Sequence, residues 1–489
     1  MSKKTIRTRN VARREVDRGR VVAWEVLRAV DEQDAYANLV LPGRLRAAGL
    51  RGRDAAFSTE LTYGTLRGRG PYDAVLAACV DRPLAEVDPP LLDALRLGAH
   101  QLLGMRVPAH AGVAATVDVV RAEVGQGAAG FANAVLRRVA GKDLAAWLAE
   151  VAPDAEADPV GHLAVVHSHP VWIVRALQGA LRTWGRDDAE LPDLLAADNA
   201  RPPVTLAALP GFADPATIVA RAGEGAALGR WSPIAVTITG PPDGVPDVRA
   251  GRARVQDEGS QLVTLALAGA QIGAGADDVG SAQDGGQWLD LCAGPGGKAA
   301  LLGAALADRN LPAARLVAVE VSEHRADLVR GSTSAVATRL DIEVRCADGR
   351  LVGQEEPAAY DRVLVDAPCT GLGALRRRPE ARWRRTPADL ATLGPLQRAL
   401  LASALDAVRP GGLVAYVTCS PHPAETRLVV ADALRKRDDV EQIDARPALV
   451  TASGGRLSAD DLGVGPDVQL WPHVHGTDAM CLALLRRTR

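Results

Sequence analysis

Two cysteines stand in polar motifs of the C-terminal half, Cys369 in the run Asp366–Gly371 and Cys419 in the run Thr418–Ser420. A thiolate that adds to carbon 6 of a pyrimidine makes carbon 5 enamine-like and able to attack a methyl sulfonium, which is covalent catalysis. A carboxyl group such as Asp366 can protonate or hydrogen-bond the ring nitrogen during the addition. A second thiol can then assist expulsion of the first. The two cysteines therefore suit a nucleophile and a release group, and their spacing leaves open which is which.

The segments that must position these residues are short apolar strands that each end in a polar residue. They cover residues 288–291, 316–319, 342–345, 363–365 and 413–417. The polar residues that follow these strands are, in the same order, the glycine-rich run 292–298, Glu320, Asp348, Asp366 and Cys419. Helical patterns alternate with them, which predicts an open parallel α/β sheet. Ligands of such sheets bind beyond the carboxyl ends of the strands. We therefore expect these polar residues to converge on one crevice.

The glycine-rich loop from Asp290 to Lys298 has features of a ligand-binding loop. Its glycines let a ligand approach the backbone, and the helix that begins near Lys298 presents free amides. The loop has neither the phosphate-binding spacing GxxxxGK[ST] nor GxGxxG. A carboxylate at Glu320 suits a ribose diol, and Asp348 suits an adenine amino group. The pattern favours an adenosine ligand such as S-adenosylmethionine; the alternative is a tight turn with two helix-capping carboxylates.

The N-terminal part has a different pattern. Residues 15–145 carry apolar side chains at helical spacing and predict a helical bundle. The Ala-, Asp- and Pro-rich stretch that follows predicts a linker, and a polar Gly/Asp-rich run over 273–287 predicts an insertion. The expected order is a helical domain over 1–145, a linker over 146–175, a small α+β subdomain over 176–250 and the catalytic domain over 251–489.

The composition of the 489-residue chain limits the function classes. Hydrophobic residues make up 47% and charged residues 24%, which is typical of a globular protein and excludes a mainly disordered one. No apolar run reaches the length of a membrane span, and no apolar signal-like segment opens the chain. The six cysteines are scattered without CxxC or zinc spacing, so we expect reduced thiols, a cytoplasmic location and no metal. The net charge of −2 includes two basic clusters, 1–20 and 376–385, which predict local contact with a polyanion.

These motifs resemble those of the RsmB/Nop2/Sun (Fmu) family of RNA cytosine-5 methyltransferases. The matching stretches are Val255–Leu262, Asp290–Lys298, Tyr360–Asp361, Asp366–Gly371, Arg409–Gly412 and Thr418–Ser420. The resemblance covers the chain from about residue 176 to its end and implies that Cys419 is the nucleophile and Cys369 the release cysteine. It also implies that Asp366 positions the base and its proton and that Lys298 can reach the target base. The implied S-adenosylmethionine site is lined by Cys292, Ala293, Gly294, Pro295, Gly296, Gly297, Lys298, Glu320, Asp348 and Asp366.

The N-terminal part resembles a NusB-like RNA-binding domain, through the runs Arg53–Phe57, Glu60–Arg67, Leu95–Leu102 and Asn133–Arg138. This pairing is similar to the bacterial RsmB type, which modifies small-subunit ribosomal RNA. The resemblance implies an all-α NusB-like domain, a small α+β RNA-binding subdomain and a Rossmann-like α/β catalytic domain. It implies S-adenosylmethionine as methyl donor and 16S ribosomal RNA as partner, with no membrane and no obligate protein partner. The chain departs from the family pattern at Glu320, after Arg201–Pro203, at Pro423–Thr426 and at Thr477–Cys481.

Three other functions stay open. Methylation of an exocyclic nitrogen would need no covalent thiol. A non-catalytic RNA-binding or antitermination-type protein would need neither intact cysteines nor an intact glycine loop. The same chemistry could also act on tRNA. Because the cluster Arg376–Arg385 with Trp383 directly follows the release-cysteine motif, we expect it to bind RNA phosphates at the rim of the crevice.

Overall fold

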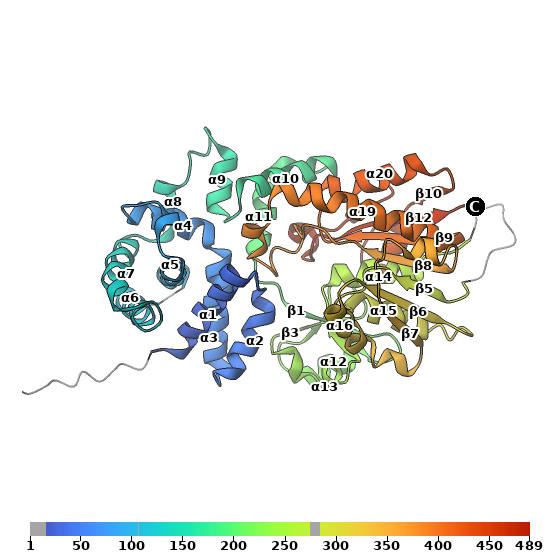
Figure 1. Ribbon diagram of the computed structural model, residues 1–489, viewed down its shortest axis with the longest axis horizontal. Coiled ribbons are helices and arrows are strands. Elements are labelled where there is room, and N and C mark those ends of the chain that lie inside the picture. Colours follow the sequence, from blue (N-terminus) through green and yellow to red (C-terminus); the bar gives the residue numbers. More distant parts are fainter. Residues whose placement is uncertain (1–15, 106, 274–283) are drawn as a thin grey trace, which may run out of the picture. The chain divides into compact units, whose positions relative to one another are not determined.

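The computed structural model describes residues 16–105, 107–273 and 284–489, which form two compact units (Figure 1). Unit 1 comprises the chain up to Val171 together with Arg378–Glu380, and unit 2 comprises Trp172–Arg377 and Ala381–Arg489. Residues 1–15 of the basic N-terminal arm, and most of the insertion expected over 273–287, lie outside the described residues.

Unit 1 is helical, as the apolar spacing predicts. Its helices are α1 (Arg18–Gln33), α2 (Ala37–Ala47), α3 (Gly52–Arg67), α4 (Arg69–Cys79), α5 (Pro89–Leu103), α6 (Ala109–Val119), α7 (Gln126–Val139), α8 (Leu144–Val151) and α9 (Pro159–Val166). Leu95 of α5 is fully buried against Val75 of α4 and Leu136 of α7. Helices α8 and α9 fall in the stretch expected to be a linker, and each is capped by an aspartate, Asp143 or Asp158, that accepts a backbone N–H of its first turn.

Unit 2 begins with two helices and a small antiparallel sheet of strand order β2-β3-β1-β4. These elements are α10 (Val171–Thr183), α11 (Leu191–Asn199), β1 (Val204–Ala208), α12 (Pro215–Ala222), β2 (Ala227–Leu228), β3 (Ala235–Ile238), α13 (Pro246–Arg249) and β4 (Ala253–Val255). Leu206 of β1, Val236 of β3 and Ile218 of α12 form its core and are fully buried.

The larger sheet of unit 2 has the order β10-β12-β9-β8-β5-β6-β7, with β11 paired to β12. Its strands are β5 (Gln287–Asp290), β6 (Arg315–Glu320), β7 (Asp341–Cys346), β8 (Tyr360–Asp366), β9 (Val408–Thr418), β10 (Val440–Ile443), β11 (Val468–Gln469) and β12 (Cys481–Arg487). Strands β5 to β9 are parallel, and β12 pairs antiparallel with β9 and β10. The strand order reverses at β5, which lies between β6 and β8, so this is the switch point at which such sheets bind ligands.

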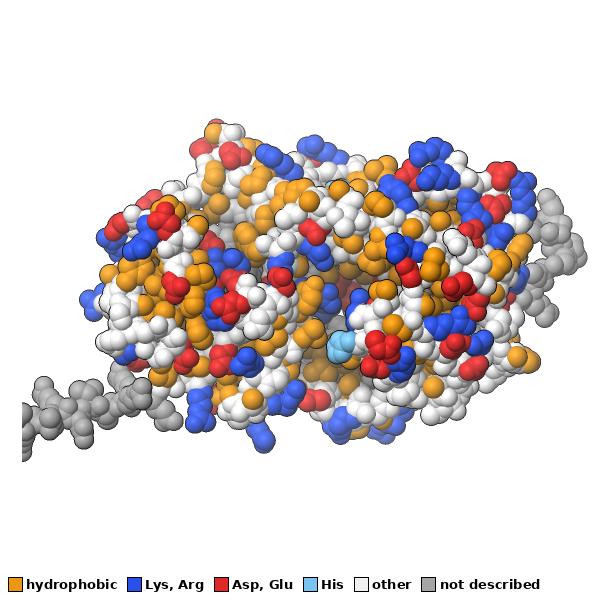
Figure 2. Space-filling model, viewed as in Figure 1, with side chains coloured by type: hydrophobic (Ala, Val, Ile, Leu, Met, Phe, Trp, Pro, Cys, Tyr) orange, Lys and Arg blue, Asp and Glu red, His pale blue; other side chains and the backbone are white. Residues whose placement is uncertain are grey.

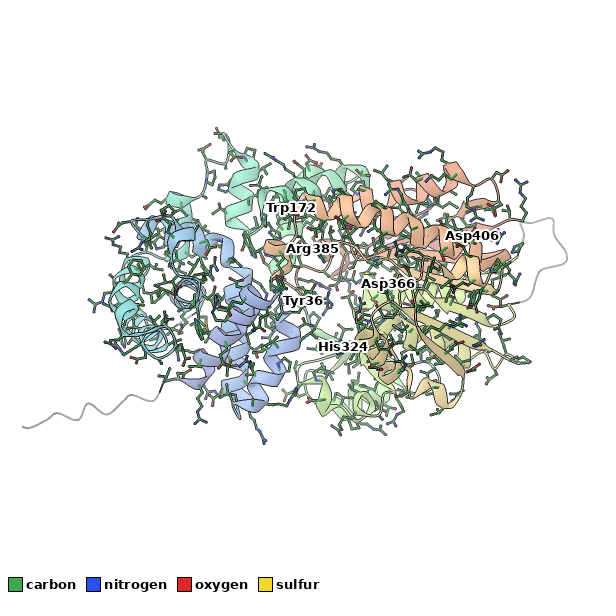
Figure 3. All side chains as sticks on the ribbon, viewed as in Figure 1. Tyr36, Trp172, His324, Asp366, Arg385 and Asp406 are labelled. Carbon is green, nitrogen blue, oxygen red and sulfur yellow. The ribbon has the colours of Figure 1, made fainter. Side chains whose placement is uncertain are left out.

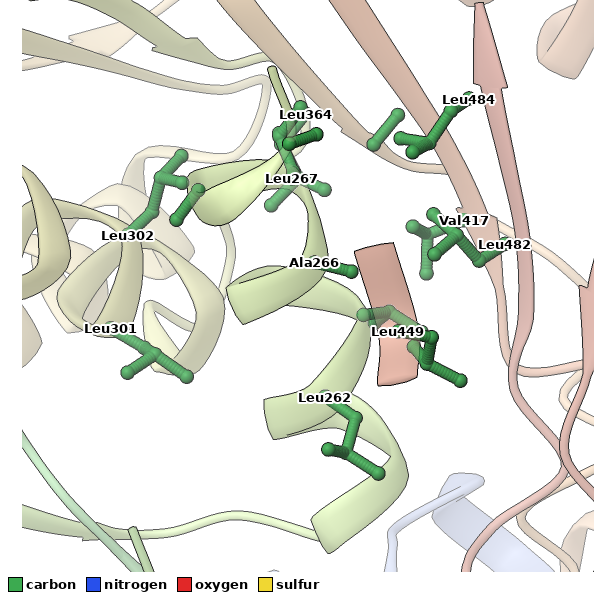
Figure 4. Close-up of a cluster of buried hydrophobic side chains, with 14 of the residues drawn as sticks. Leu262, Ala266, Leu267, Leu301, Leu302, Leu364, Val417, Leu449, Leu482 and Leu484 are labelled. Atoms are coloured by element: carbon green, nitrogen blue, oxygen red, sulfur yellow. The ribbon is translucent and has the colours of Figure 1, made fainter. Parts of the chain in front are cut away.

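Helices cover both faces of this sheet (Figure 1). They are α14 (Glu258–Gly269), α15 (Gly297–Ala307), α16 (Glu323–Thr333), α17 (Val352–Glu355), α18 (Ala381–Arg384), α19 (Pro387–Ala407), α20 (Arg427–Lys436), α21 (Arg446–Ala452) and α22 (Pro472–His475). Side chains alternate between the faces, so Leu364 of β8 packs with α14 and α15 while its neighbours Val363 and Val365 pack with α19 and α20. Figure 4 shows the first of these cores, with Leu262 of α14 and Leu301 of α15 among its members. The predicted α/β domain is confirmed.

The register of β8 with β9 aligns the ends of these two strands. Asp366, the last residue of β8, lies opposite Val417, next to the last residue of β9. At the opposite ends of the strands the pairing is irregular, because β9 takes up extra residues between the pairs Tyr360–Val408 and Arg362–Leu413. Gly411 lies in this bulge with φ +77°, a conformation that favours glycine.

The surface carries both charge signs. Figure 2 shows acidic and basic side chains interspersed over the visible face, in keeping with the net charge of −2. Within the described ranges, no helix is both long and apolar enough to cross a membrane.

Candidate active site

The loop between β5 and α15 is a tight backbone cradle. Gly296 has φ +105°, and a Cβ there would overlap the Ser332 side chain. A Cβ on Gly294 would overlap a carboxyl oxygen of Glu320. The amide of Ala293 donates to the carbonyl of Val319 at 2.9 Å, which holds the loop against the end of β6. The glycines are therefore required by close packing as well as by backbone conformation.

Glu320 is the last residue of β6 and is held in place from two sides. Its Oε1 accepts the backbone N–H of Ser322 at 3.0 Å, and its Oε2 lies 3.3 Å from Nη2 of Arg325. The same Arg325 nitrogen donates to the carbonyl of Gly294 at 2.6 Å. Arg325 thus connects the carboxyl group to the glycine loop, a role that sequence reasoning missed because the residue lies in an ordinary helical pattern.

Asp348 lies beyond β7, beside the same loop. Its carboxylate pairs with Arg350 at 2.5 Å, and this hydrogen bond holds the pKa of Asp348 below its ordinary value. A Cβ on the next residue, Gly349, would lie 2.8 Å from the carbonyl of Leu291, so the segment packs directly against the end of β5.

The expected pair Lys298 and Asp366 is joined by an ion pair of 2.8 Å between Nζ and Oδ2 (Asp366 is labelled in Figure 3). Burial acts to lower the pKa of Lys298, but the charge and hydrogen bond of Asp366, with smaller effects from Cys419 and Asp290, raise it. Asp290 is fully buried, and its Oδ1 accepts the N–H of Cys292 at 3.3 Å. Burial, with the nearby charge of Asp366, raises the pKa of Asp290 to about 7. The sequence offered no indication of this shift, since Asp290 reads only as the first residue of the loop motif.

The two cysteines meet at the ends of β8 and β9. Their Sγ atoms are 3.4 Å apart, and the amide of Gly373 donates to the carbonyl of Cys419 at 2.9 Å. The hydrogen bond with Cys419, burial and the charges of Cys419 and Glu425 raise the pKa of Cys369 well above its ordinary value. Burial, with the charges of Asp290 and Asp366, does the same for Cys292. Cys369 is therefore a neutral thiol at neutral pH and can donate its S–H to the Cys419 sulfur.

A buried carboxyl group supports this pair, and sequence reasoning missed its role. Glu425 has no exposed surface and accepts hydrogen bonds from Thr370 and from Gln397. The sequence shows Glu425 only as part of the run Pro423–Thr426. Its partner Thr370 is 55 residues away, so no local pattern connects the two.

The expectation that the cluster Arg376–Arg385 binds RNA phosphates is wrong for its first members. Arg376 is 6% exposed, and its guanidinium donates to Asp478 and Asp257, each at 2.7 Å. Arg377 donates to the same two carboxylates, at 3.0 and 2.6 Å. Donors engaged with carboxylates in the interior are not available to a phosphate. We call these four side chains the buried arginine–aspartate cluster.

Arg382 is a second buried member. It has no exposed surface and donates to Oδ1 of Asn199 at 2.6 Å and to the carbonyl of Asp198 at 2.7 Å. Its guanidinium therefore ties α18 to the end of α11 and does not bind RNA phosphate.

Taken together, the geometry provides a glycine cradle with carboxyl groups at the switch point of an α/β sheet, next to two adjacent thiols. A model of the family "16S rRNA methyltransferase RsmB/F" matches residues 280–486, and a model of the NusB family matches residues 17–141. Rv1407 of Mycobacterium tuberculosis, which is named as a methyltransferase, is 53% identical over 99% of both chains. Ribosomal RNA small subunit methyltransferase B of Vibrio cholerae is 30% identical over 82% of this chain and 85% of its own length. The chain belongs to the RsmB/F methyltransferase family. This confirms the resemblance found in the sequence.

The fold of this RsmB/F-family methyltransferase also has a solved counterpart. The crystal structure of PH0851 matches with a TM-score of 0.77 over 97% of this chain and 99% of that chain, at 20% identity. At this identity the match concerns the fold, and it extends over both the helical and the α/β parts of the chain.

Proposed function

We propose that this protein methylates carbon 5 of a cytosine in small-subunit ribosomal RNA, through a covalent bond between Cys419 and the base. The observation that carries the proposal is the pair of thiols, 3.4 Å apart, at the ends of two adjacent parallel strands. Methylation of an exocyclic nitrogen needs a polar clamp on the amine and gives no role to such a pair. A non-catalytic RNA-binding protein has no need of it.

The residues around the glycine loop fit S-adenosylmethionine, which supplies an electrophilic methyl group when bound. Close packing of Gly294 against Glu320 and of Gly296 against Ser332 sets the shape of the loop, and the space beside Gly297 is open to a ligand. We assign Glu320 to the ribose diol and Asp348 to the adenine amino group of this ligand. Asp290 adds a buried oxygen, Oδ2, that has no hydrogen-bond partner within the described part of the chain. The remaining expected lining residues, Cys292 to Lys298, form the loop itself.

The chain's own residues divide the chemistry among them. The Cys419 sulfur adds to carbon 6 of the cytosine, and the electron pair of the C5–C6 double bond becomes available at carbon 5 for the methyl group. Asp366 positions the ring nitrogen and its proton, and Lys298 orients Asp366 and contacts the base. Carbon 5 then gives its proton to water, the double bond re-forms, and the C6–S bond breaks with its pair on the Cys419 sulfur. Cys369 assists that release.

The substrate assignment rests on the relatives that act on ribosomal RNA by name and on the NusB-family match. We propose that residues 1–145 and the small subdomain over 176–250 bind RNA, with 146–175 joining them to the catalytic domain over 251–489. In unit 1, Arg44, Arg46, Arg51 and Arg53 are all exposed around the α2–α3 connection, and we call them the α2–α3 arginine loop. Within the described residues, one ion pair involves this loop, between Arg44 and Glu25. This loop, and not the buried arginine–aspartate cluster, is where we expect contacts with phosphates.

The test of the covalent mechanism uses two variants with opposite expected results. Cys419→Ala should abolish methylation of small-subunit ribosomal RNA and form no adduct, because carbon 5 is never activated. Cys369→Ala should accumulate an enzyme–RNA adduct that survives denaturing gel electrophoresis and disappears in the double variant. An adduct from Cys419→Ala alone would reverse the two roles, and two active variants without adducts would refute covalent catalysis. Methylation of tRNA but not of ribosomal RNA would contradict the substrate assignment.

A further inference from the structure

The carboxyl group of Glu425 fixes the peptide groups on both sides of Cys369. One of its oxygens accepts the backbone N–H of Thr370 at 2.7 Å, and the other accepts Oγ1 of Thr370 at 2.5 Å. Nε2 of Gln397 donates to Glu425 at 3.2 Å and to the carbonyl of Pro368 at 2.8 Å. The residues immediately before and after Cys369 are thus held by one buried pair of side chains, Glu425 and Gln397, neither of which has exposed surface.

The same group is connected to the loop of the other cysteine. Oγ1 of Thr370 lies 3.4 Å from Oγ of Ser420, the residue after Cys419. The backbone carbonyl of Glu425 accepts the hydroxyl of Tyr416, a residue of β9, at 2.8 Å. Because β9 leads directly to Cys419, these contacts set the position of Cys369 relative to Cys419 through Glu425.

We propose that Glu425 is a positioning residue for the release step, holding Cys369 where its S–H meets the Cys419 sulfur as that sulfur leaves the base. This inference rests on the covalent mechanism proposed above. In the release step carbon 5 gives its proton to water, the C–H electron pair forms the C5–C6 double bond, and the C6–S bond breaks with its pair on sulfur. The S–H of Cys369 donates a hydrogen bond to the developing thiolate. Addition and methyl transfer use Cys419, so removal of Glu425 slows release selectively.

Removal of Glu425 should slow the release step for two reasons. Hydrogen-bonded groups in a reacting pair lose about a hundredfold in rate when they are misplaced by roughly 1 Å. Without Glu425, the Thr370 N–H and hydroxyl and the Gln397 amide have no shared acceptor, so the Cys369 loop is free to shift. The charge of Glu425 also helps, after the Cys419 hydrogen bond and burial, to raise the pKa of Cys369, which keeps this sulfur protonated as the donor.

The experiment follows methyl transfer and release separately in a single turnover with labelled S-adenosylmethionine and small-subunit ribosomal RNA. Samples quenched over time are run on denaturing gels, which separate protein-linked methylated RNA from free methylated RNA. Glu425→Ala should form the methylated adduct at the wild-type rate and resolve it at least about tenfold more slowly. Glu425→Gln keeps the size and an acceptor oxygen, so it should restore release. Gln397→Met removes the amide with little change in volume and provides the same test if Glu425→Ala does not fold.

Cys369→Ala serves as the reference variant in which release of the adduct is blocked. It distinguishes failure of the Glu425 proposal from failure of the covalent mechanism. If Cys369→Ala accumulates the adduct while both Glu425→Ala and Gln397→Met resolve it at the wild-type rate, the role of Glu425 is refuted. Equal slowing of methyl transfer and release would also refute it, because that pattern indicates a general structural effect. If Cys369→Ala accumulates no adduct, the covalent mechanism itself fails and the Glu425 proposal falls with it.

Discussion

Arg376→Ala should destabilise the protein and leave the ionic-strength dependence of RNA binding unchanged. The guanidinium of Arg376 makes three hydrogen bonds of 2.7 Å, to Asp478, to Asp257 and to the carbonyl of Gly476. The two carboxylates have side chains only 9% and 6% exposed, so the variant leaves two buried charges with one arginine between them. Removing one partner of a buried ion pair typically raises the free energy of the folded state by about 3–5 kcal/mol.

The expected change is measurable by urea unfolding and by thermal unfolding. For a chain of this size the entropy of unfolding is about 1 kcal/mol/K, so a destabilisation of this magnitude lowers Tm by roughly 3–5 °C. Because buried charges are poorly screened, the effect should persist when salt is raised several-fold. Arg435→Ala is the matched control, since Arg435 is 71% exposed and pairs with Asp432 on the surface of α20. Its effect should stay below about 1 kcal/mol.

The opposite pattern would refute this reasoning. If Arg376→Ala unfolds like the wild type and the logarithmic salt dependence of RNA binding becomes shallower, the arginine contacts phosphate in the complex. The buried arginine–aspartate cluster would then be a resting arrangement that RNA breaks.

Three further results are expected. Triple alanine substitution of Arg46, Arg51 and Arg53 in the α2–α3 arginine loop should make the slope of log K for RNA binding against log salt concentration shallower. The expected change is about 0.7–0.9 for each phosphate that is no longer neutralised, and an unchanged slope would contradict RNA binding at this surface. Asp290 should release its proton near pH 4 when unfolded and near 7 when folded, so its stabilising contribution is complete at low pH and lost as pH rises through about 7. The free energy of unfolding of Asp290→Asn should therefore rise relative to that of the wild type by on the order of 4 kcal/mol between about pH 4 and pH 8. A difference that does not change with pH would show that Asp290 titrates normally. Gly294→Ala should weaken binding of S-adenosylhomocysteine at least about tenfold in calorimetry through overlap with Glu320, and wild-type affinity would mean that the cradle does not hold the ligand.

Local patterns were sufficient to predict most of the fold. Strands β5, β6, β8 and β9 each contain an apolar run followed by a polar residue, and Glu320 and Asp366 are indeed the last residues of β6 and β8. Strand β7 instead alternates polar and apolar residues. Helical spacing likewise identified unit 1. These features depend on neighbours in sequence, which is why periodicity reveals them.

The features that the sequence did not reveal depend on side chains that are far apart in the chain and meet only in the folded protein. A run of arginines normally indicates an exposed basic surface, yet Arg376 is buried and Arg377 is half-buried. Asp257 and Asp478, more than 100 residues away in either direction, neutralise both. Glu425 is similar, since only the folded chain brings it to Thr370. Burial of a charged side chain is a property of the pair, and pairing across the fold leaves no trace in local composition.

The bulge at the start of β9 makes the position of Cys419 independent of the number of residues at that end of the strand. Extra residues are taken up around Gly411, at the end of the strand away from Cys419, while the pairing from Arg362–Leu413 to Asp366–Val417 continues without a slip. Insertions or deletions around residues 408–412 can therefore be accommodated without moving either sulfur. A single residue inserted between Leu413 and Thr418 would instead displace Cys419 by about 3.3 Å, one strand step, which is as large as the present separation of the two sulfur atoms.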